Sequence, residues 1–245
     1  MKKNQDYISG VFETQKFAHR KEPFYEGLEE IKKIGYSVED YMQYYPCFTG
    51  HMTLARYLSL YESYKETLGI AGHIAEVGVY KGGALLYFAK LTQIFESNNL
   101  TQVHGFDWFE GNKPSDFEDK IIEGSDIASF ENLMTLIKAQ QLENNVFVHK
   151  IDVTKELENF FEQHPHLQFK IVFLDAGMYE VVKSCLPIFW DRLAKGGYLI
   201  LDQYNHEVAP GETLAVKEIL PDVQVRTFQV FWIVAYFHQQ RFFWL

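Results

Sequence analysis

The sequence predicts an α/β protein with a Rossmann-like, doubly wound sheet of about seven strands and a helical N-terminal extension. From His73 onward, short apolar runs alternate with longer amphipathic segments, which is the pattern of βαβ units and a parallel sheet. The preceding residues have helical periodicity and no strand-like run. A length of 245 residues with 47% hydrophobic content is enough for one large domain with an extension.

The change of pattern near residue 70 predicts two parts, a helical N-terminal cap over residues 1–70 and a Rossmann-like domain over residues 71–245. Helical periodicity in the cap covers Tyr25–Ile34 and Leu54–Leu68. Two strands near the end of the chain are expected to pair antiparallel and complete the sheet. The expected strands are His73–Val79, Gln102–Asp107, Asn145–Ile151, Phe169–Asp175, Tyr198–Asp202, Val223–Val230 and Phe231–Phe237.

Capping residues and glycines predict where the helices begin and end. Gly82–Gly83 should open the helix after the first strand, and Ser125–Asp126 should cap a helix that ends near Gln141. Gly196–Gly197 is expected to end a helix that starts at Met178. A last helix is expected near Leu214–Leu220.

Charge and composition exclude several classes of protein. The net charge of −10 disfavours nucleic acid as a partner, because an acidic surface repels the phosphate backbone. Two cysteines without a Cys-x-x-Cys motif do not indicate a disulfide framework or a thiolate zinc site. The longest apolar run, Val230–Phe237, is much shorter than the about 20 residues of a membrane span. We therefore expect a cytoplasmic protein that has no membrane partner.

The clearest motif follows the first core strand, in residues 75–83. Glu76, Gly78 and Gly82 lie where a strand turns through glycines into a helix, and ligands of open α/β sheets bind at such turns. A dinucleotide-binding loop would have a glycine where Tyr80 stands. The spacing therefore favours a cofactor with an adenosine and no pyrophosphate.

Four carboxylates follow successive strands: Glu76, Asp107, Asp152 and Asp175. Asp107 ends the second strand, where an acidic side chain can accept hydrogen bonds from both ribose hydroxyls of a nucleoside. Some of the four could instead cap the following helices, and Asp152, which precedes Thr154, fits this alternative best.

Four segments together resemble class I S-adenosylmethionine-dependent methyltransferases, and more closely the macrocin O-methyltransferase family, which methylates sugar hydroxyls. They are Ala75–Gly83, Gly105–Gly111, Leu174–Glu180 and Gly196–Tyr204. The resemblance runs in order from about Thr53 to Leu220.

The resemblance implies a site for S-adenosyl-L-methionine. Glu76, Gly78 and Gly82 would lie along its methionine moiety, and Tyr80 belongs to the same loop. Asp107 would bind the ribose and Asp152 would approach the adenine, with Asp175 completing the site. Trp108 or Phe109 could pack on the adenine, although either could equally be an ordinary core aromatic.

The family also implies an acceptor site, where Asp175 and Asp202 would hold the sugar hydroxyl or a Mg²⁺ ion. Two family positions differ here: Gly177 replaces the proposed base, and Gln203 replaces an acidic metal ligand. These changes weaken the expectation of a metal. His206 follows on the same loop and is our candidate for the base, the alternative being a solvated loop histidine.

We therefore expect an S-adenosylmethionine-dependent O-methyltransferase that acts on a sugar hydroxyl of a nucleotide-activated or glycan precursor. A small-phenol O-methyltransferase and a non-catalytic binding protein that retains the fold are the alternatives. The helical N-terminal part, residues 1–70, is expected to close over the substrate or to form the interface of a dimer or other homo-oligomer, and its tyrosine-rich segment Tyr36–Tyr45 suits such a contact. An ordinary helical layer on the sheet is the alternative for this part.

Overall fold

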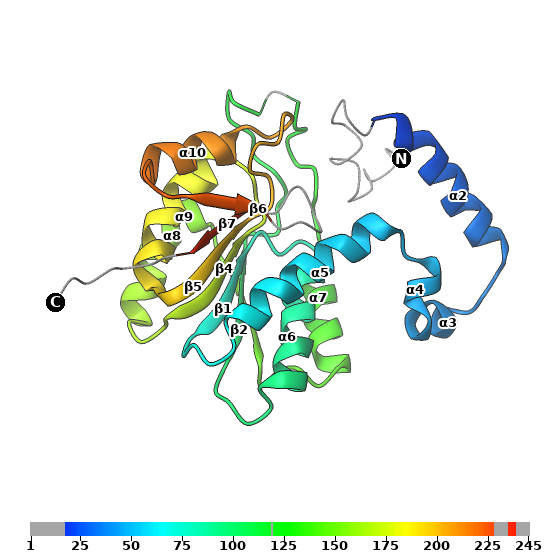
Figure 1. The fold of residues 1–245 in the computed structure, drawn as a ribbon, viewed down its shortest axis with the longest axis horizontal. Coiled ribbons are helices and arrows are strands. Elements are labelled where there is room, and N and C mark those ends of the chain that lie inside the picture. Colours follow the sequence, from blue (N-terminus) through cyan, green and yellow to red (C-terminus); the bar gives the residue numbers. More distant parts are fainter. Residues whose placement is uncertain (1–17, 119, 228–234, 239–245) are drawn as a thin grey trace.

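The sheet has the strand order β3-β2-β1-β4-β5-β7-β6, in which β1 to β5 are parallel and β7 is antiparallel to β5 and β6. The computed structural model describes residues 18–118, 120–227 and 235–238 (Figure 1). The strands are β1 His73–Val77, β2 Val103–Asp107, β3 Val146–Lys150, β4 Phe169–Leu174, β5 Leu193–Leu201, β6 Val225–Thr227 and β7 Ala235–His238.

Helices cover both faces of this sheet (Figure 1). Helices α5, α6 and α7 lie on one face and α8, α9 and α10 on the other. The helices are α2 Lys21–Lys33, α3 Val38–Gln43, α4 Tyr45–Phe48, α5 His51–Glu66, α6 Gly83–Phe95, α7 Phe130–Ala139, α8 Val153–Gln163, α9 Tyr179–Arg192 and α10 Gly211–Ile219, and a short 3-10 helix, η1, covers Ala18–Arg20.

Strand β4 lies at the centre of the sheet and separates two hydrophobic cores. All six of its residues are buried. Ile171 and Phe173 belong to the core beneath α5, α6 and α7, whereas Val172 and Leu174 belong to the core beneath α8, α9 and α10. Successive side chains of a strand point to opposite faces, so a strand covered on both sides is mostly apolar, and Lys170 is the one charged residue of β4.

The predicted α/β fold with a parallel five-stranded core and N-terminal helices is confirmed. The two late strands extend the sheet at β5, although residues 228–234 of the predicted pair lie outside the described residues. In the parts of the chain that the structure describes, no helix is long and apolar enough to cross a membrane.

Two predicted helix boundaries are wrong. Helix α7 is capped by Ser129, whose Oγ accepts a hydrogen bond from Asn132 N at 3.1 Å, and not by Ser125–Asp126. Asp126 lies three residues before this cap and instead accepts a hydrogen bond from the Asn112 side chain in the preceding loop.

Helix α9 ends at Arg192, and Gly196–Gly197 lies inside β5. A Cβ atom at residue 197 would come within 2.8 Å of the carbonyl oxygen of Lys170. Close approach of two strands, rather than the end of a helix, therefore requires this glycine.

Helix α5 contacts the sheet through a hydrogen bond from Tyr64 to a buried ion pair between β4 and the end of α6. Lys170 of β4 is fully buried, and its Nζ lies 2.6 Å from Glu96 Oε1 at the end of α6. The hydroxyl of Tyr64 in α5 donates to the same oxygen at 2.5 Å. The structure thus packs α5 into the domain that was predicted to begin at residue 71.

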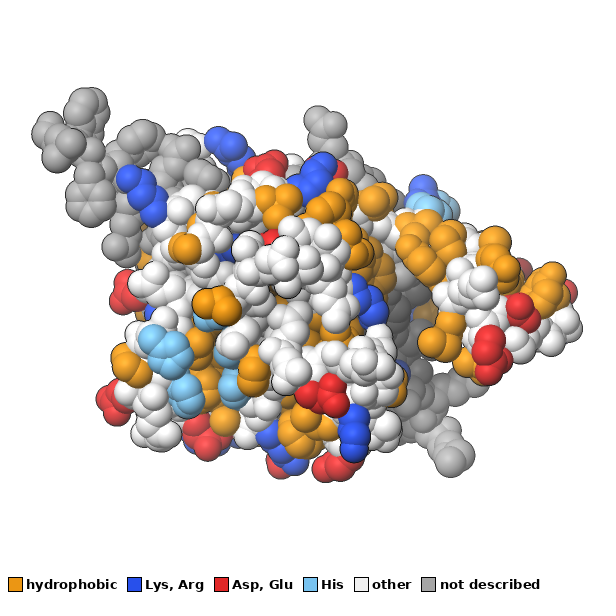
Figure 2. Space-filling model, turned by 90° about the horizontal axis from the view of Figure 1, so that it is seen from below, with side chains coloured by type: hydrophobic (Ala, Val, Ile, Leu, Met, Phe, Trp, Pro, Cys, Tyr) orange, Lys and Arg blue, Asp and Glu red, His pale blue; other side chains and the backbone are white. Residues whose placement is uncertain are grey.

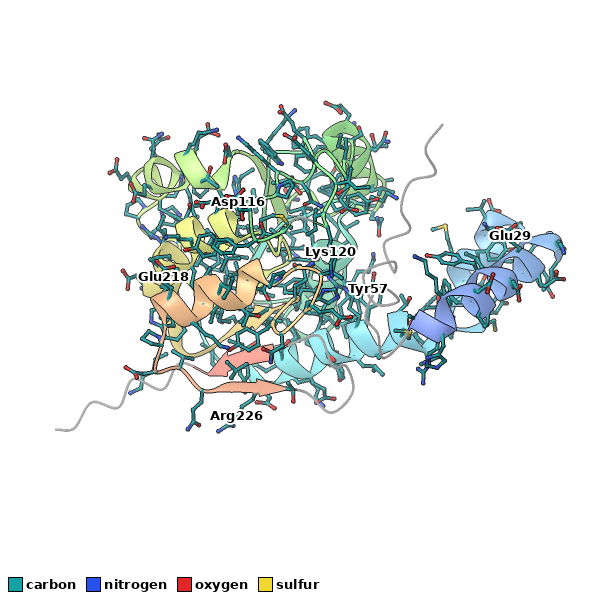
Figure 3. All side chains as sticks on the ribbon, turned by 90° about the horizontal axis from the view of Figure 1, so that it is seen from above. Glu29, Tyr57, Asp116, Lys120, Glu218 and Arg226 are labelled. Carbon is teal, nitrogen blue, oxygen red and sulfur yellow. The ribbon has the colours of Figure 1, made fainter. Side chains whose placement is uncertain are left out.

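Helices α2 to α4 form an arm that stands apart from the sheet and its covering helices (Figure 1). None of the residues in these three helices is buried. Figure 3 shows the contrast: Glu29 lies on the arm, whereas Tyr57 of α5 lies against the body, where its ring packs 4.9 Å from that of Tyr87.

Glu96→Gln should destabilise the protein by about 3–5 kcal/mol, because it leaves the buried Lys170 ammonium without a charged partner. Burial alone would raise the pKa of Glu96, but hydrogen bonds from Lys170, Tyr64 and Thr101 lower it. The stabilisation should therefore be present above the ordinary glutamate pKa and be lost as the pH falls below it.

Urea unfolding at neutral pH would measure this loss. Glu62→Gln is the matched control, because the Lys65–Glu62 pair is largely exposed and should contribute at most about 1 kcal/mol. Equal losses in the two variants would contradict the assigned role of Glu96.

Candidate functional site

A cavity of about 520 Å³ lies at the carboxyl ends of β1 to β4, at the edge where the strand order reverses between β1 and β4. Open α/β sheets bind ligands at such a switch point, and the volume is in the usual range for small-molecule sites. Strand ends, the loop after β2 and the first turns of α8 and α9 supply the lining.

The glycine turn after β1 brings the backbone against the end of β4. Gly78 lines the cavity and has a φ of +88°. A Cβ atom there would lie 2.6 Å from the carbonyl oxygen of Asp175, so glycine is required by both conformation and space. Tyr80 also lines the cavity.

Gly82, which was predicted to lie along the cofactor, has a structural role at the start of α6. It is the left-handed N-cap of α6, and it is absent from the described lining of the cavity. A Cβ atom at this residue would lie 2.4 Å from Leu133 Cδ1. This glycine therefore allows α7 to pack closely over the start of α6.

Asp107 connects the turn after β1 to the turn after β2. Its Oδ2 accepts hydrogen bonds from Val79 N at 2.8 Å and Tyr80 N at 2.9 Å, and its Oδ1 accepts one from Phe109 N at 2.7 Å. A carboxylate has about four acceptor positions, so roughly one remains for a ligand hydroxyl. The predicted contact with the ribose would therefore use the acceptor capacity that the two loops leave free.

The structure separates the two aromatic candidates. Trp108 lines the cavity, and its Nε1 donates a hydrogen bond to Gly111 O at 2.7 Å. Phe109 is buried in the core, with its ring 5.4 Å from that of Phe130. Of the two, Trp108 is placed to contact a ligand.

Asp152 lines the cavity and also caps α8, as the alternative from sequence proposed. Its Oδ1 accepts hydrogen bonds from Thr154 N at 3.0 Å and Thr154 Oγ1 at 2.6 Å, and Lys155 pairs with its Oδ2. Burial acts to raise the pKa of Asp152, but these hydrogen bonds lower it, so the group is an ionised acceptor at the cavity wall.

Glu76 is buried below the cavity and is not among its described lining residues. Its Oε2 has no hydrogen-bond partner in the described part of the chain. Burial raises the pKa of Glu76 well above its ordinary value, against a lowering effect of Arg56, and the charges of Asp107 and Asp202 raise it further.

Arg56 of α5 is the site residue that sequence reasoning missed. Its Nη2 lies 2.6 Å from Asp175 Oδ2, and its Nη1 donates to Asp202 Oδ1. The guanidinium also lies over the ring of Phe173, 5.4 Å from its centre. The available signal was an arginine within the predicted helix Leu54–Leu68, for which a layer on the sheet was the alternative, since a buried arginine needs a partner.

The two aspartates are therefore brought together, as predicted, but by an arginine. Burial raises the pKa of Asp175 well above its ordinary value; Arg56 acts to lower it, and the charges of Asp202 and Glu76 raise it. Asp175 lines the cavity, whereas Asp202 is buried behind it.

The predicted metal site does not fit these residues. Asp175 and Asp202 are paired with a guanidinium, and the two neighbouring positions supply Gly177 and the neutral Gln203. Within the described residues, no group of three or more acidic, histidine or cysteine side chains is placed to hold a metal ion.

His206 is buried and is not among the described residues that line the cavity. Its Nδ1 accepts a hydrogen bond from Val208 N at 3.2 Å. The loop thus directs this side chain into the protein, and its expected role as the base stays a prediction.

Comparisons with known proteins agree with this geometry. The family model described as macrocin O-methyltransferase (TylF) matches residues 32–234. A comparison with curated proteins found no match.

Three solved structures share the fold. CalS11, a calicheamicin methyltransferase, has a TM-score of 0.80 and 21% identity, covering 96% of this chain and 97% of that chain. An apo structure of CalS11, a TDP-rhamnose 3'-O-methyltransferase of calicheamicin biosynthesis, has a TM-score of 0.74 and 21% identity, covering 96% and 99%. The O-methyltransferase NovP has a TM-score of 0.64 and 18% identity, covering 76% and 80%.

The family match includes the glycine turn, the loop of Asp107 and the strand ends that carry Asp175 and Asp202. The chain belongs to the macrocin O-methyltransferase (TylF) family of S-adenosylmethionine-dependent O-methyltransferases.

Proposed function

We propose that this enzyme transfers the methyl group of S-adenosylmethionine to a hydroxyl of a sugar that is carried on a nucleotide or on a glycan precursor. The observation that carries the proposal is the cavity at the switch point of the sheet, which Gly78, Asp107 and Asp175 line together. The similarity to CalS11, a TDP-rhamnose 3'-O-methyltransferase, supports a nucleotide-linked sugar.

Gly78, Tyr80, Asp107, Trp108 and Asp152 would hold the cofactor, since all five line the cavity. Trp108 offers a flat ring to the adenine, and Asp107 offers its remaining acceptor position to the ribose. Glu76 and Gly82 would act indirectly, through charge beneath the cavity and through packing of α6. The bound cofactor supplies a methyl group on a positively charged sulfur.

Methyl transfer requires the acceptor oxygen to be aligned with the methyl group and to lose its proton. Asp175 is the titratable group best placed to accept this proton, because its carboxylate lines the cavity and its pKa is raised by burial. His206, the candidate from sequence, is the second possibility. A metal ion has no part in this scheme.

Turnover on nucleotide sugars tests the proposed substrate class. The enzyme should methylate at least one member of a panel of thymidine- and uridine-diphosphate sugars and show no comparable rate on catechols. Mass spectrometry of the products would locate the added methyl group. Methylation of catechols alone would assign a phenol substrate, and cofactor binding without transfer to any acceptor would favour a binding protein.

Asp107→Ala should weaken S-adenosylmethionine binding about 10- to 100-fold, because it removes a charge-assisted contact and the two oxygens that accept three hydrogen bonds from the binding loops. Isothermal titration calorimetry would measure the affinity. Asp116→Ala is the matched control, since Asp116 is exposed on the following loop (Figure 3) and its loss changes the net charge equally. Similar affinities of the two variants would contradict the role of Asp107.

Asp175→Asn should lower kcat by about 10²- to 10⁴-fold, the usual range for loss of a general base, while His206→Gln should retain most of the activity. A base must be deprotonated to act, so the wild-type rate should be full above the raised pKa of Asp175 and fall as the pH drops through it. Calorimetry with the cofactor would check that both variants still bind it. The opposite ranking of the two variants would make His206 the base.

We also propose that the arm formed by α2 to α4 docks on a second copy of the chain. Figure 2 shows hydrophobic side chains gathered on the projecting arm, and helices as short as α3 and α4 are marginal without a packing partner. Sedimentation should give a dimer or a larger oligomer, and Met42→Asp should weaken it, because Met42 is 74% exposed on this arm. A wild-type monomer at micromolar concentration would contradict the proposal.

A further inference from the structure

The positive charge between the carboxylates of Asp175 and Asp202 is supplied by a side chain of the protein, Arg56. Asp175 follows β4 and Asp202 follows β5, so the two carboxylates lie at neighbouring strand ends and repel each other. The Arg56 guanidinium lies between them and donates one N–H hydrogen bond to each, from Nη2 to Asp175 and from Nη1 to Asp202. Its planar fork suits two carboxylate oxygens, and it stays protonated at any physiological pH.

This arginine is held from more than one side. It projects from α5, its guanidinium lies over Phe173 of β4, and only 15% of its side chain is exposed. A charge fixed in this way is not a surface group that folds back onto an open site. Each of these two carboxylates already has a positively charged partner, so its charge is in part neutralised before any other cation arrives.

Gly177 and Gln203, which lie two residues after Asp175 and one after Asp202, pack against each other, and neither provides an acidic ligand. Gly177 has a φ of +63°, and a Cβ atom there would lie 1.8 Å from Gln203 Oε1. The Gln203 side chain thus occupies the space that a side chain at residue 177 would need. The backbone N–H of Gln203 donates to Glu212 Oε1 at 2.9 Å, which anchors the loop.

The chemistry of this donor set does not suit a divalent ion. Mg²⁺ prefers six oxygen ligands in a near-octahedral arrangement, and its carboxylate partners must be free to approach it. Here, the carboxylates of Asp175 and Asp202 are both paired with the singly charged Arg56. The next side chain after Asp202, that of Gln203, is a neutral amide.

We propose that Arg56 is a positioning residue that takes the place of a divalent metal ion, so that this enzyme orients Asp175 and Asp202 and transfers the methyl group without a metal. The inference rests on the proposed sugar O-methylation. The proton of the acceptor hydroxyl leaves to a carboxylate, the new carbon–oxygen bond forms as the carbon–sulfur bond breaks, and no further reactant is needed.

Titration of the wild-type enzyme with MgCl₂ by calorimetry, with bound S-adenosylmethionine, tests this inference without depending on turnover. We expect no saturable Mg²⁺ binding up to millimolar concentration. Methyl transfer after treatment with EDTA should proceed at the untreated rate. Stoichiometric Mg²⁺ binding, or loss of turnover in EDTA that Mg²⁺ restores, would overturn the proposal.

Two variants separate a positioning role from a merely structural one. Arg56→Lys keeps a positive charge but not the fork, and should lower kcat at least tenfold with little change in cofactor affinity. The double variant Arg56→Ala, Gln203→Asp adds a third acidic group and frees the aspartates, and should gain saturable Mg²⁺ binding. Unchanged kcat in a folded Arg56→Lys enzyme would contradict the proposal, whether or not the double variant folds.

The same measurements distinguish failure of this inference from failure of the proposed function. If the wild type binds S-adenosylmethionine but methylates no sugar, the proposed function fails, while the Mg²⁺ titration still reports on the role of Arg56. If sugar methylation occurs and requires Mg²⁺, the proposed function stands and the inference about Arg56 fails.

Discussion

Repulsion among buried carboxyl groups is the constraint on which the arrangement of this site depends. Glu76, Asp175, Asp202 and Glu212 are gathered near the ends of β1, β4 and β5, and burial raises the pKa of three of them, Glu76, Asp175 and Glu212. Arg56 is the cation paired with two members of this group. Because Arg56 belongs to α5, the position of this helix is part of the site and not only of the core.

The opposite end of α5 is fixed by a second buried charge. Tyr64 lies eight residues after Arg56, or about 12 Å along the helix axis, and it shares the Glu96 carboxylate with Lys170. Buried ion pairs of this kind add little net stability but are costly to break, because each leaves an unpaired charge. Together the two clusters specify where α5 lies and how it is rotated on the sheet.

The sequence predicted those features that follow from local pattern and from strand ends. Apolar runs placed β1 to β4 within a few residues, and the carboxyl ends of these strands brought Gly78, Asp107, Asp152 and Asp175 to one cavity. Glycines were more ambiguous. In the sequence, Gly197 was interpreted as the end of a helix. In the structure, a glycine is required at this position because the carbonyl of Lys170 on the neighbouring strand leaves no room for a Cβ atom, and local sequence does not contain that contact.

The same limit explains why Arg56 was missed and why the burial of His206 was not foreseen. Arg56 is 119 residues from Asp175 and 146 from Asp202 in sequence, so only the packing of α5 against the sheet brings them together. His206 is close to Asp202 in sequence, yet the turn directs its ring inward, with Nδ1 on the backbone of Val208. Proximity along the chain predicts which loop a residue belongs to, but side-chain direction depends on the hydrogen bonds that the loop makes.

Gly177 and Gln203, the two positions that lack the acidic residues of the family pattern, depend on each other in the fold. Each change alone removes an acidic group that the family pattern has, which suggests a weakened site. In the fold the two positions are in contact, and the amide fills the space that the missing side chain leaves. Because acidic side chains are absent at residues 177 and 203, less negative charge surrounds Asp175 and Asp202. The single positive charge of the Arg56 guanidinium can then neutralise much of it, whereas two further aspartates would require a doubly charged ion.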